Sequence, residues 1–366
     1  MSKLNRRHFM IAAASTPALA ASQFPKPAIA KGVKELRLAM SWPKNFPGLA
    51  TPAQRFAKRF ELATEGRYRI RILGAPSKLY DPLKCLDALQ QGTVHMYHSS
   101  EYYNTGKLPA YAFFTTVPFG LTASEMDGWL HFGGGQKLWD ELAGQFGVKP
   151  FACGQTGSQM GGWAKKPLKT LDDFKGLRFR IPGLGGDVLR ELGAAPVNLA
   201  GTDIMPALSA GRIDATEWVG PYNDLAFGFY KVAKHYHYPG FHEPGPTLCL
   251  GVAKGLYDGM SKADQAILEA CALAENNLDL AEYMANNARA LNILINKHKV
   301  QLHEYSDEFY QAAGKAAKDV VAKAGTGDDL SKRIYESYSK FRKLSLEWQK
   351  YSDQSYLAKR ALTEKS

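Results

Sequence analysis

Short apolar strands alternate with helices along much of the chain, and this alternation limits the fold more than any other feature of the sequence. Residues 36–41 and 68–73 alternate apolar and polar side chains, as half-buried strands do. Residues 52–64, between them, repeat apolar side chains at helical spacing. A strand, a helix and a strand in this order predict an α/β fold.

A second constraint is a pattern that occurs twice. In residues 88–96 and again in residues 207–215, the end of a helix is followed by a glycine, Gly92 or Gly211, and then by a buried strand. Glycine suits the left-handed backbone conformation at the end of a helix. The repetition indicates two similar α/β lobes.

A length of 366 residues allows about two domains. The strand predicted over 247–253 is apolar enough to rejoin the first lobe, so that segments cross between the lobes. We therefore predict lobe I over 31–153 plus 246–275, and lobe II over 154–245. Residues 276–366 are assigned to a spanning helix and a helical C-terminal extension.

The elements predicted for lobe II are short and clearly separated. A glycine-rich run over 183–186 leads into a helix over 187–192. Thr202 is a side chain suited to cap the following helix, which is predicted over 203–210.

The C-terminal third is predicted to be helical. Ser261, with Asp264 three residues later, has the spacing of a helix start, and the pattern runs without proline or glycine to about Lys297. Two further helices are predicted over 307–323 and 328–362. The last one carries aromatic side chains at three- and four-residue spacing: Tyr335, Tyr338, Phe341, Trp348 and Tyr351. We interpret this stripe as core or subunit packing rather than as a cofactor site.

Residues 1–30 have the composition of an export signal. They carry four basic side chains and no acidic one, and Arg6-Arg7 precedes a short apolar run over 10–21 that ends near small residues. The arginine pair resembles a twin-arginine signal. A membrane anchor is the alternative, but twelve weakly apolar residues are too few to span ~30 Å of hydrocarbon. We therefore predict a twin-arginine-type signal peptide and a periplasmic protein.

The net charge of +11 raises the question of nucleic acid or another anionic surface. Removal of residues 1–30 leaves 42 basic and 35 acidic side chains, a net charge of +7. These basic residues are scattered, and the tightest internal pair, Lys165-Lys166, fits a solvated turn. The sequence therefore does not favour a nucleic-acid partner.

Side chains that bind soft metals lack a recognisable spacing. The four cysteines are Cys85, Cys153, Cys249 and Cys271. They lie in predicted helices or strands without a C-x-x-C motif, and buried free thiols are favoured over disulfides. His235, His237 and His242 lie close in sequence. An H-x-H pair without a third ligand favours an aromatic strand edge over a metal site.

Signatures of nucleotide binding and of nucleophilic catalysis are missing. Ser158 does not stand in a G-x-S-x-G motif, and no phosphate-binding loop occurs. Residues 183–186 match a dinucleotide fingerprint only in part, because Val188 occupies the third glycine position. These patterns give no support to an enzyme of either class.

Four polar side chains interrupt glycine- and aromatic-rich strand ends of lobe II: Gln159, Arg180, Glu217 and Glu243. Ligands settle at strand ends in open α/β lobes, and the planar fork of an arginine matches the two oxygens of a carboxylate. Carboxylate and amide oxygens are hard ligands, which favour sodium, calcium or magnesium over zinc. The alternative is a structural salt bridge from Arg180 to Glu217 or Glu243.

Four motifs in this region, 157–163, 176–181, 214–222 and 228–233, resemble the substrate-binding proteins of tripartite ATP-independent periplasmic (TRAP) transporters. The similarity is to their DctP-like family, and it is greatest to the subgroup that binds 2-oxo or 2-hydroxy monocarboxylates of the lactate or pyruvate type. It implies a two-lobed periplasmic-binding-protein fold, hinged around a cleft, with a long helix across both lobes. It also implies delivery of the ligand to the membrane subunits of a transporter, and a homodimer formed through the C-terminal helices.

The resemblance further implies roles for individual residues. Arg180 falls on the arginine that pairs with the substrate carboxylate. Gln159, Glu217, the backbone carbonyl of Trp218 and Glu243 fall on the ligands of a metal ion that bridges protein and substrate. Contacts from lobe I are expected from Ser100, Tyr102 and Tyr103.

Charge bears on the identity of the ion. Glu217, Glu243 and a bound monocarboxylate carry three negative charges, and Arg180 carries one positive charge. Calcium would neutralise the remainder, whereas sodium would leave one negative charge in the cleft, which is disfavoured when buried. We expect calcium or sodium, with a slight preference for calcium.

A metal-dependent lyase or hydrolase is the rival interpretation, with Glu217 or Glu243 as general base. Such an enzyme needs an activated water or nucleophile and a group with a tuned pKa. Neither is visible in the sequence, so we expect a binding protein and not an enzyme.

Overall fold

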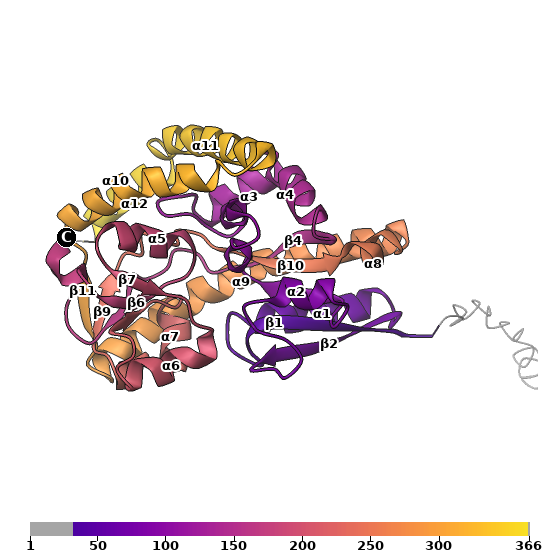
Figure 1. Cartoon of the computed structure of the whole chain (residues 1–366), viewed down its shortest axis with the longest axis horizontal. Helices are drawn as coiled ribbons and strands as arrows, with labels where there is room; N and C mark the ends of the chain where they lie inside the picture. The colour runs from indigo at the N-terminus through magenta and orange to yellow at the C-terminus, as the bar shows by residue number, and fades with distance from the viewer. Residues whose placement is uncertain (1–31, 365–366) are drawn as a thin grey trace, which may run out of the picture.

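A computed structural model describes residues 32–364 of the chain as two β-sheets flanked by helices (Figure 1). The first sheet has the strand order β2-β1-β3-β10-β4, in which β1 pairs in parallel with β2 and β3, and β10 pairs antiparallel with β3 and β4. Its strands are β1 (Lys34–Pro43), β2 (Tyr68–Ala75), β3 (Met96–Ser99), β4 (Val148–Gln155) and β10 (Thr247–Ala253).

The second sheet has the order β11-β9-β5-β8-β6-β7. Here β6 pairs in parallel with β7 and β8, β9 pairs in parallel with β11, and β5 is antiparallel to both of its neighbours. Its strands are β5 (Gly162–Ala164), β6 (Arg178–Arg180), β7 (Ala195–Val197), β8 (Ala215–Thr216), β9 (His235–Tyr238) and β11 (Gln301–Glu304). We use lobe I and lobe II for the parts built on the first and second sheets.

Helices cover these sheets and connect them. The α-helices are α1 (Thr51–Ala63), α2 (Cys85–Gln90), α3 (Ala123–His131), α4 (Gly135–Gly144), α5 (Gly183–Glu191), α6 (Gly201–Ser209), α7 (Pro221–Phe227), α8 (Lys254–Asp258), α9 (Lys262–Asn296), α10 (Asp307–Ala324), α11 (Asp329–Gln349) and α12 (Asp353–Thr363). Short 3-10 helices are η2 (Glu101–Asn104), η3 (Pro109–Phe114), η4 (Leu171–Phe174) and η5 (Phe229–Lys231).

The repeated pattern of the sequence occurs once in each sheet, as predicted. Helix α2 ends before Gly92 and leads to β3, and α6 ends before Gly211 and leads to β8. Both glycines have φ of +70°, the left-handed conformation that other residues rarely adopt. Strand β10 returns to the first sheet between β3 and β4, which confirms that the chain crosses between the sheets.

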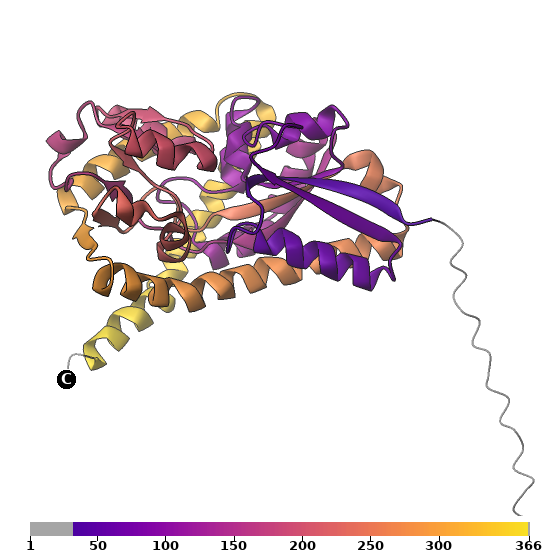
Figure 2. The ribbon, with the colours of Figure 1, turned by 90° about the horizontal axis from the view of Figure 1, so that it is seen from below.

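Helix α9 is the long helix predicted to span both lobes. It begins where expected, because the Ser261 hydroxyl accepts a hydrogen bond from the backbone N–H of Asp264 at 3.1 Å. Figure 2 shows α9 running along one side of the molecule beneath both sheets. It contacts α1 of lobe I and α7 of lobe II, so it connects the two lobes.

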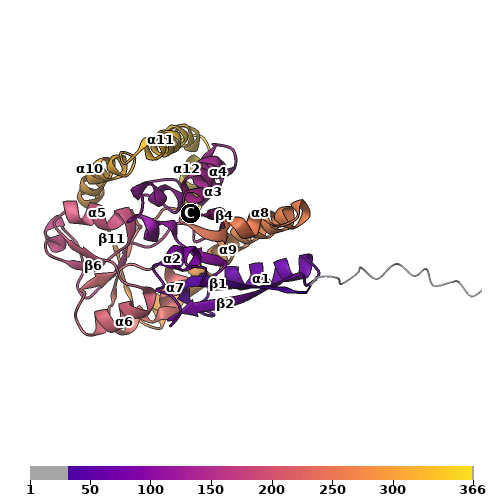
Figure 3. The ribbon, with the colours of Figure 1, turned by 45° about the vertical axis from the view of Figure 1, so that its right-hand side comes forward.

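Helices α10 and α11 lie together on another side of the molecule (Figure 3). Phe309 of α10 is buried against Phe241 of lobe II, and Tyr338 of α11 is buried against Trp129 of lobe I. The predicted packing role of the aromatic stripe is thus confirmed for Tyr338. Trp348 and Tyr351 are instead exposed.

Three local predictions are wrong. The helix predicted over 328–362 is two helices, α11 and α12, which are separated at residues 350–352. Ser352 is the N-cap residue of α12 and Asp353 is its first residue, and both residue types favour the start of a helix. Helix α6 begins at Gly201 with Ala200 as its N-cap, so Thr202 lies inside the helix. The glycine run over 183–186 forms the first turn of α5 and does not precede the helix.

Strand β11 was not predicted, and it brings part of the C-terminal region into the sheet of lobe II. The proposed lobe limits remain a prediction. The predicted export signal over 1–30 lies outside the described residues. Among residues 32–364, no helix combines the length and the apolar character that a membrane crossing requires.

Candidate functional site

A small cavity lined by residues of both sheets lies between the two lobes. Seven of the eight predicted site residues line it: Ser100, Tyr102, Tyr103, Gln159, Arg180, Trp218 and Glu243. The eighth, Glu217, forms an ion pair with Arg180. The structure therefore brings together the residues that the sequence had suggested from both lobes.

Arg180 is the last residue of β6 and is buried, with 1% of its surface exposed. Its Nε donates to the carbonyl of Leu199 at 3.1 Å, and its Nη1 forms an ion pair with Glu217. Its Nη2 has no hydrogen-bond partner among the described residues. The structural salt bridge considered from the sequence is present, yet one end of the guanidinium group remains unpaired in the cavity wall.

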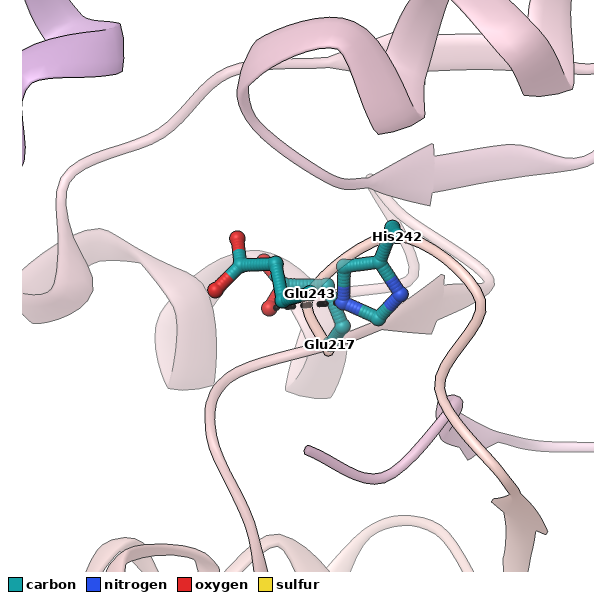
Figure 4. A group of neighbouring side chains, drawn as sticks. All are labelled: Glu217, His242 and Glu243. Carbon is teal, nitrogen blue, oxygen red and sulfur yellow. Dashed lines mark ion pairs between the residues drawn. The ribbon is translucent and has the colours of Figure 1, made fainter. Parts of the chain in front are cut away.

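Glu217 follows β8, where its backbone N–H donates to the carbonyl of Arg180 at 3.1 Å. Neighbouring parallel strands thus hold the two residues side by side. One carboxylate oxygen meets Arg180, while Oε2 lies 3.5 Å from His242 Nε2 (Figure 4). Ligand atoms of Glu217, His242 and Glu243 lie within 4.8 Å of one another, so this group could hold a metal ion.

Gln159 and Glu243 come from two loops that are joined by backbone hydrogen bonds. The N–H of Gln159 donates to the carbonyl of Glu243 at 3.1 Å, and the N–H of Gly240 donates to the carbonyl of Gln159 at 2.9 Å. The Gln159 amide nitrogen donates to Thr156 Oγ1 at 3.1 Å, which leaves its Oε1 without a partner. Glu243 Oε2 is also unpartnered. Two buried oxygens therefore lack a donor in the same region.

The electrostatics follow from this burial. Burial raises the pKa of Glu243 well above its ordinary value, and the charge of Glu217 raises it further, while Arg180 opposes the shift. Burial lowers the pKa of Arg180, but the charges of Glu217, Tyr103 and Tyr102 outweigh it, so the pKa is raised. The site therefore keeps Arg180 charged and has more carboxyl groups than it can compensate.

The lobe I wall is formed by β3 and η2. Tyr102 and Tyr103 contact each other edge to face, with ring centroids 4.9 Å apart, and both line the cavity. Glu101, which follows Ser100 and precedes the two tyrosines, points into lobe I. Its carboxylate is fully buried and accepts from Trp139 Nε1 at 3.1 Å, which anchors η2.

Several lining residues were missed by sequence reasoning. They are Trp42, Leu49, Thr156, Val219, Pro246 and Leu248. Most are apolar side chains in or near strands, where the sequence pattern indicates only burial. His242 was also missed as a neighbour of Glu217; it was grouped with His235 and His237, although both of these lie on β9 away from the cavity lining.

The aromatic-edge interpretation of His237 is supported by its contacts. Its ring stacks on Tyr305 at a centroid distance of 5.3 Å, and its Nε2 accepts from the backbone N–H of Leu168 at 3.0 Å. Burial lowers its pKa to about 4. All four cysteines are buried and free, as predicted.

Comparisons with known proteins agree with this architecture. The family model for bacterial extracellular solute-binding proteins, family 7 (DctP), matches residues 38–327. The monocarboxylate 2-oxoacid-binding periplasmic protein of Nostoc sp. is 40% identical over 348 residues, which cover 94% of this chain and 95% of that protein.

Two solved structures extend the comparison. A TRAP periplasmic solute binding protein from Pseudoalteromonas atlantica, with bound sodium and pyruvate, is 35% identical with a TM-score of 0.85 and covers 89% of this chain and 99% of that chain. A TRAP transporter solute binding protein from Bordetella bronchiseptica, a mixed-occupancy dimer with copurified calcium and picolinate, is 32% identical with a TM-score of 0.88 and covers 92% and 100%.

These matches confirm the predicted two-lobed periplasmic-binding-protein fold with its helical C-terminal region. The family model covers most of the chain, and the relatives align over nearly their full length. The chain therefore belongs to the DctP family of bacterial extracellular solute-binding proteins, the substrate-binding components of TRAP transporters.

Proposed function

We propose that this protein binds a small 2-oxo or 2-hydroxy monocarboxylate, of the pyruvate or lactate type, together with a sodium or calcium ion in the cavity between the lobes. The observation that carries the proposal is the unpaired Nη2 of Arg180 beside unsatisfied oxygens of Gln159 and Glu243. One group fits a carboxylate and the others fit a hard cation.

The ligands of the two solved relatives share a chemical feature. Pyruvate carries a keto oxygen next to its carboxylate, and picolinate carries a ring nitrogen at the same position. Each can therefore chelate one ion through two neighbouring atoms while a carboxylate oxygen faces an arginine. For this chain we propose Gln159, Glu217, the Trp218 carbonyl and Glu243 as the ion ligands, with Arg180 as the partner of the carboxylate.

The fit of an ion rests on the orphaned oxygens. Glu217 Oε2, Gln159 Oε1 and Glu243 Oε2 are buried without hydrogen-bond donors. Leaving such groups unsatisfied costs about 1–3 kcal/mol each, and more when they are charged. A cation among them would remove that cost and compensate the excess of carboxyl groups.

The ion pair between Arg180 and Glu217 suggests that ion and substrate bind cooperatively. Nη1 of Arg180 is occupied by Glu217, so two-pronged capture of a carboxylate requires that this contact weaken. An ion on Glu217 would compete with Arg180 for the carboxylate and release Nη1 toward the substrate. We expect each partner to raise the affinity for the other by the same factor.

The proposal is tested by titrating pyruvate and lactate into the chelator-treated protein, with sodium or calcium added back separately. Binding that is restored by one ion, and at least about tenfold weaker without it, supports the proposal. Equal affinity with and without both ions would remove the bridging ion from the site.

Arg180→Ala tests the carboxylate contact, with Arg178→Ala as its matched control. Arg178 lies on the same strand and pairs at the surface with Asp214 at 2.6 Å. We expect Arg180→Ala to lose most binding, about a hundredfold or more, because a buried charged hydrogen bond is worth about 3 kcal/mol. Arg178→Ala should bind as the unmodified protein does, and tight binding by Arg180→Ala would refute the role.

Residues 1–30 direct export by the twin-arginine route, and the closed, loaded form is presented to the membrane subunits of a TRAP transporter. Ligand is bound without chemical change, so incubation with pyruvate should yield no product.

A homodimer through the C-terminal helices is also proposed, because α12 has no buried residue and exposes Tyr356 and Leu357.

A further inference from the structure

Three histidines meet at the edge of the second sheet, away from the ligand cavity. His235 and His237 lie on β9, and His303 lies on the edge strand β11, where it pairs in register with His237. Side chains two residues apart on a strand share a face, so all three project from the same side of the sheet. The H-x-H motif of β9 thus acquires a third histidine from a strand that sequence analysis had not predicted.

His237 has no free nitrogen for a ligand. Its Nε2 accepts from the backbone N–H of Leu168 at 3.0 Å, and its Nδ1 faces the carbonyl of Gly162 at 3.4 Å. Its ring stacks on His303 at a centroid distance of 5.2 Å and an interplanar angle of 25°. His237 is therefore a buried platform that fixes the ring of His303.

His235 and His303 are only half-buried, and they face each other. His235 Nδ1 lies 2.8 Å from His303 Nε2, with ring centroids 5.0 Å apart. This hydrogen bond needs a proton on one of the two nitrogens and a lone pair on the other, so the two nitrogens share one proton. When the ring that carries the proton shifts it to its other nitrogen, both facing nitrogens offer a lone pair and a metal ion can take the place of the hydrogen bond.

We propose that His235 Nδ1 and His303 Nε2 form a second cation site, separate from the ligand cavity, for a divalent transition metal of tetragonal geometry such as Cu²⁺. Two nitrogens bound at right angles at about 2.0 Å lie about 2.8 Å apart, whereas tetrahedral zinc requires about 3.3 Å. The observed separation matches the first geometry. To bind the ion, the ring of His235, which has no such platform, must turn so that its lone pair and that of His303 converge on one point.

The surroundings limit the remaining ligands. Lys169 is the charged group near both rings, and as an exposed lysine it repels a cation only weakly because solvent screens it. Gln301 pairs with His235 in the strand register and can offer an amide oxygen. Among residues 32–364, no carboxylate joins these histidines in a three-ligand group, so water must complete the coordination.

The test is titration of the untagged mature chain with Cu²⁺, followed by calorimetry and electron paramagnetic resonance. We expect one equivalent to bind with coupling to two imidazole nitrogens. His303→Gln and His235→Gln should each weaken this binding by at least about tenfold and remove one nitrogen coupling. His298→Gln is the matched control, because His298 is half-buried like the two site histidines and stacks on Tyr230 at a centroid distance of 3.7 Å elsewhere on the lobe.

A further variant separates this site from the cavity. His242→Gln removes the only imidazole of the Glu217 group and should leave the copper coupling unchanged. If both His303→Gln and His235→Gln bind Cu²⁺ as tightly as the unmodified chain, or if His242→Gln abolishes the signal, the proposal is wrong. Should His303→Gln fail to fold by circular dichroism, His235→Gln decides, since its ring does not stack on His237.

Discussion

Asp224 is a buried carboxyl group held by three uncharged donors. Trp163 Nε1 and Tyr236 Oη donate to Oδ2 at 2.8 and 2.6 Å, and the backbone N–H of Val219 donates to Oδ1 at 3.3 Å. Burial nevertheless raises the pKa of Asp224 to about 7, because loss of solvation outweighs these hydrogen bonds. The group changes its charge near neutral pH inside lobe II.

This shift predicts a pH dependence of stability. The folded pKa lies above the unfolded value of about 3.9, so the folded state binds more protons between the two values. The free energy of unfolding should fall as pH rises from about 4 through about 7, by up to about 4 kcal/mol. Urea unfolding of the unmodified protein and of Asp224→Asn between pH 4.5 and 8 measures this. The slope should be smaller in Asp224→Asn, and equal slopes would contradict the assignment.

Residues of the cavity were predictable where a polar side chain interrupts an apolar strand end. Arg180 and Gln159 stand out in this way, and both line the cavity. Trp42 does not, because an apolar residue at the end of a strand looks like any core residue. The contact between His242 and Glu217 was also out of reach, since it depends on how the loop after β9 folds back onto β8.

At the scale of elements, α5 packs so closely on the loop carrying Glu243 that a side chain would not fit. A Cβ at Gly185 would lie 2.7 Å from the Cβ of His242 and 3.0 Å from Ile181 Cδ1. The His242 Cβ is bonded to the loop backbone, so relief of the contact would require the backbone of the loop or of α5 to shift. The glycine run that resembled a nucleotide fingerprint therefore serves close packing beside the candidate site.

We expect Gly185→Ala to destabilise the protein by about 1–3 kcal/mol and to weaken carboxylate binding, because His242 and Glu243 must shift. Gly144→Ala is the matched control, since a Cβ at this helical glycine meets nothing within 4 Å. That variant should be neutral or more stable by up to about 1 kcal/mol. Thermal unfolding and ligand titration measure both effects. Unchanged carboxylate affinity in Gly185→Ala would show that the packing of α5 at Gly185 does not position the residues of the site.

Helix α9 is tied to α1 by buried carboxylates. Arg55 Nε donates to Glu275 at 2.6 Å and its Nη1 pairs with Glu282, while Arg59 Nη1 reaches Glu275 at 3.1 Å. The Glu275 and Asp279 side chains are fully buried. Burial raises the pKa of both carboxyl groups, so their charge depends on the neighbouring arginines.

Removal of Arg55 should therefore be costly. We expect Arg55→Met to lower the free energy of unfolding by about 3 kcal/mol at neutral pH, because it leaves buried charge without its main partner. Arg69→Met is the control: Arg69 is 56% exposed and pairs with Glu61 at the surface, so its loss should cost at most about 1 kcal/mol. If both variants lose a similar free energy of unfolding, the ion pairs of Arg55 with the α9 carboxylates contribute no more to stability than a surface ion pair does.

Long elements with clear ends were predictable, and short ones were not. The α9 helix has a capping serine and 35 residues without proline or glycine, so its pattern is unambiguous. Strand β11 has four residues, Gln301–Glu304, with little apolar character, and it exists because β9 offers it a free edge. Tertiary pairing of this kind leaves no periodic signal in the sequence.

At the scale of the whole molecule, the site exists only because the chain crosses between its sheets. Strand β10 returns to the sheet of lobe I, helix α9 then contacts both lobes, and strand β11 joins the sheet of lobe II. Helices α10 and α11 contact lobe II and lobe I in turn. The repeated helix, glycine and strand pattern predicted two lobes. It could not give their relative placement, which depends on side chains of both lobes around the cavity.

The last helix, α12, contacts the preceding helix α11 and leaves most of its surface exposed. No residue of α12 is buried, and large apolar side chains are exposed on it and just before it: Trp348, Tyr351, Tyr356, Leu357 and Leu362. Exposed apolar surface of this kind commonly marks an interface between proteins. A second copy of the chain is the proposed occupant, in keeping with the dimer of the Bordetella bronchiseptica relative.

We expect the mature chain to sediment as a dimer and a chain ending at Gln349 to sediment as a monomer. The truncated chain should keep its melting temperature and its affinity for pyruvate, because α12 contributes no buried residue to either lobe. Leu357→Asp should weaken the dimer by introducing charge into the apolar surface, whereas Gln354→Asp, at an exposed polar position, should not. A full-length monomer at micromolar concentration, or a truncated chain that still dimerises, would refute the role of α12.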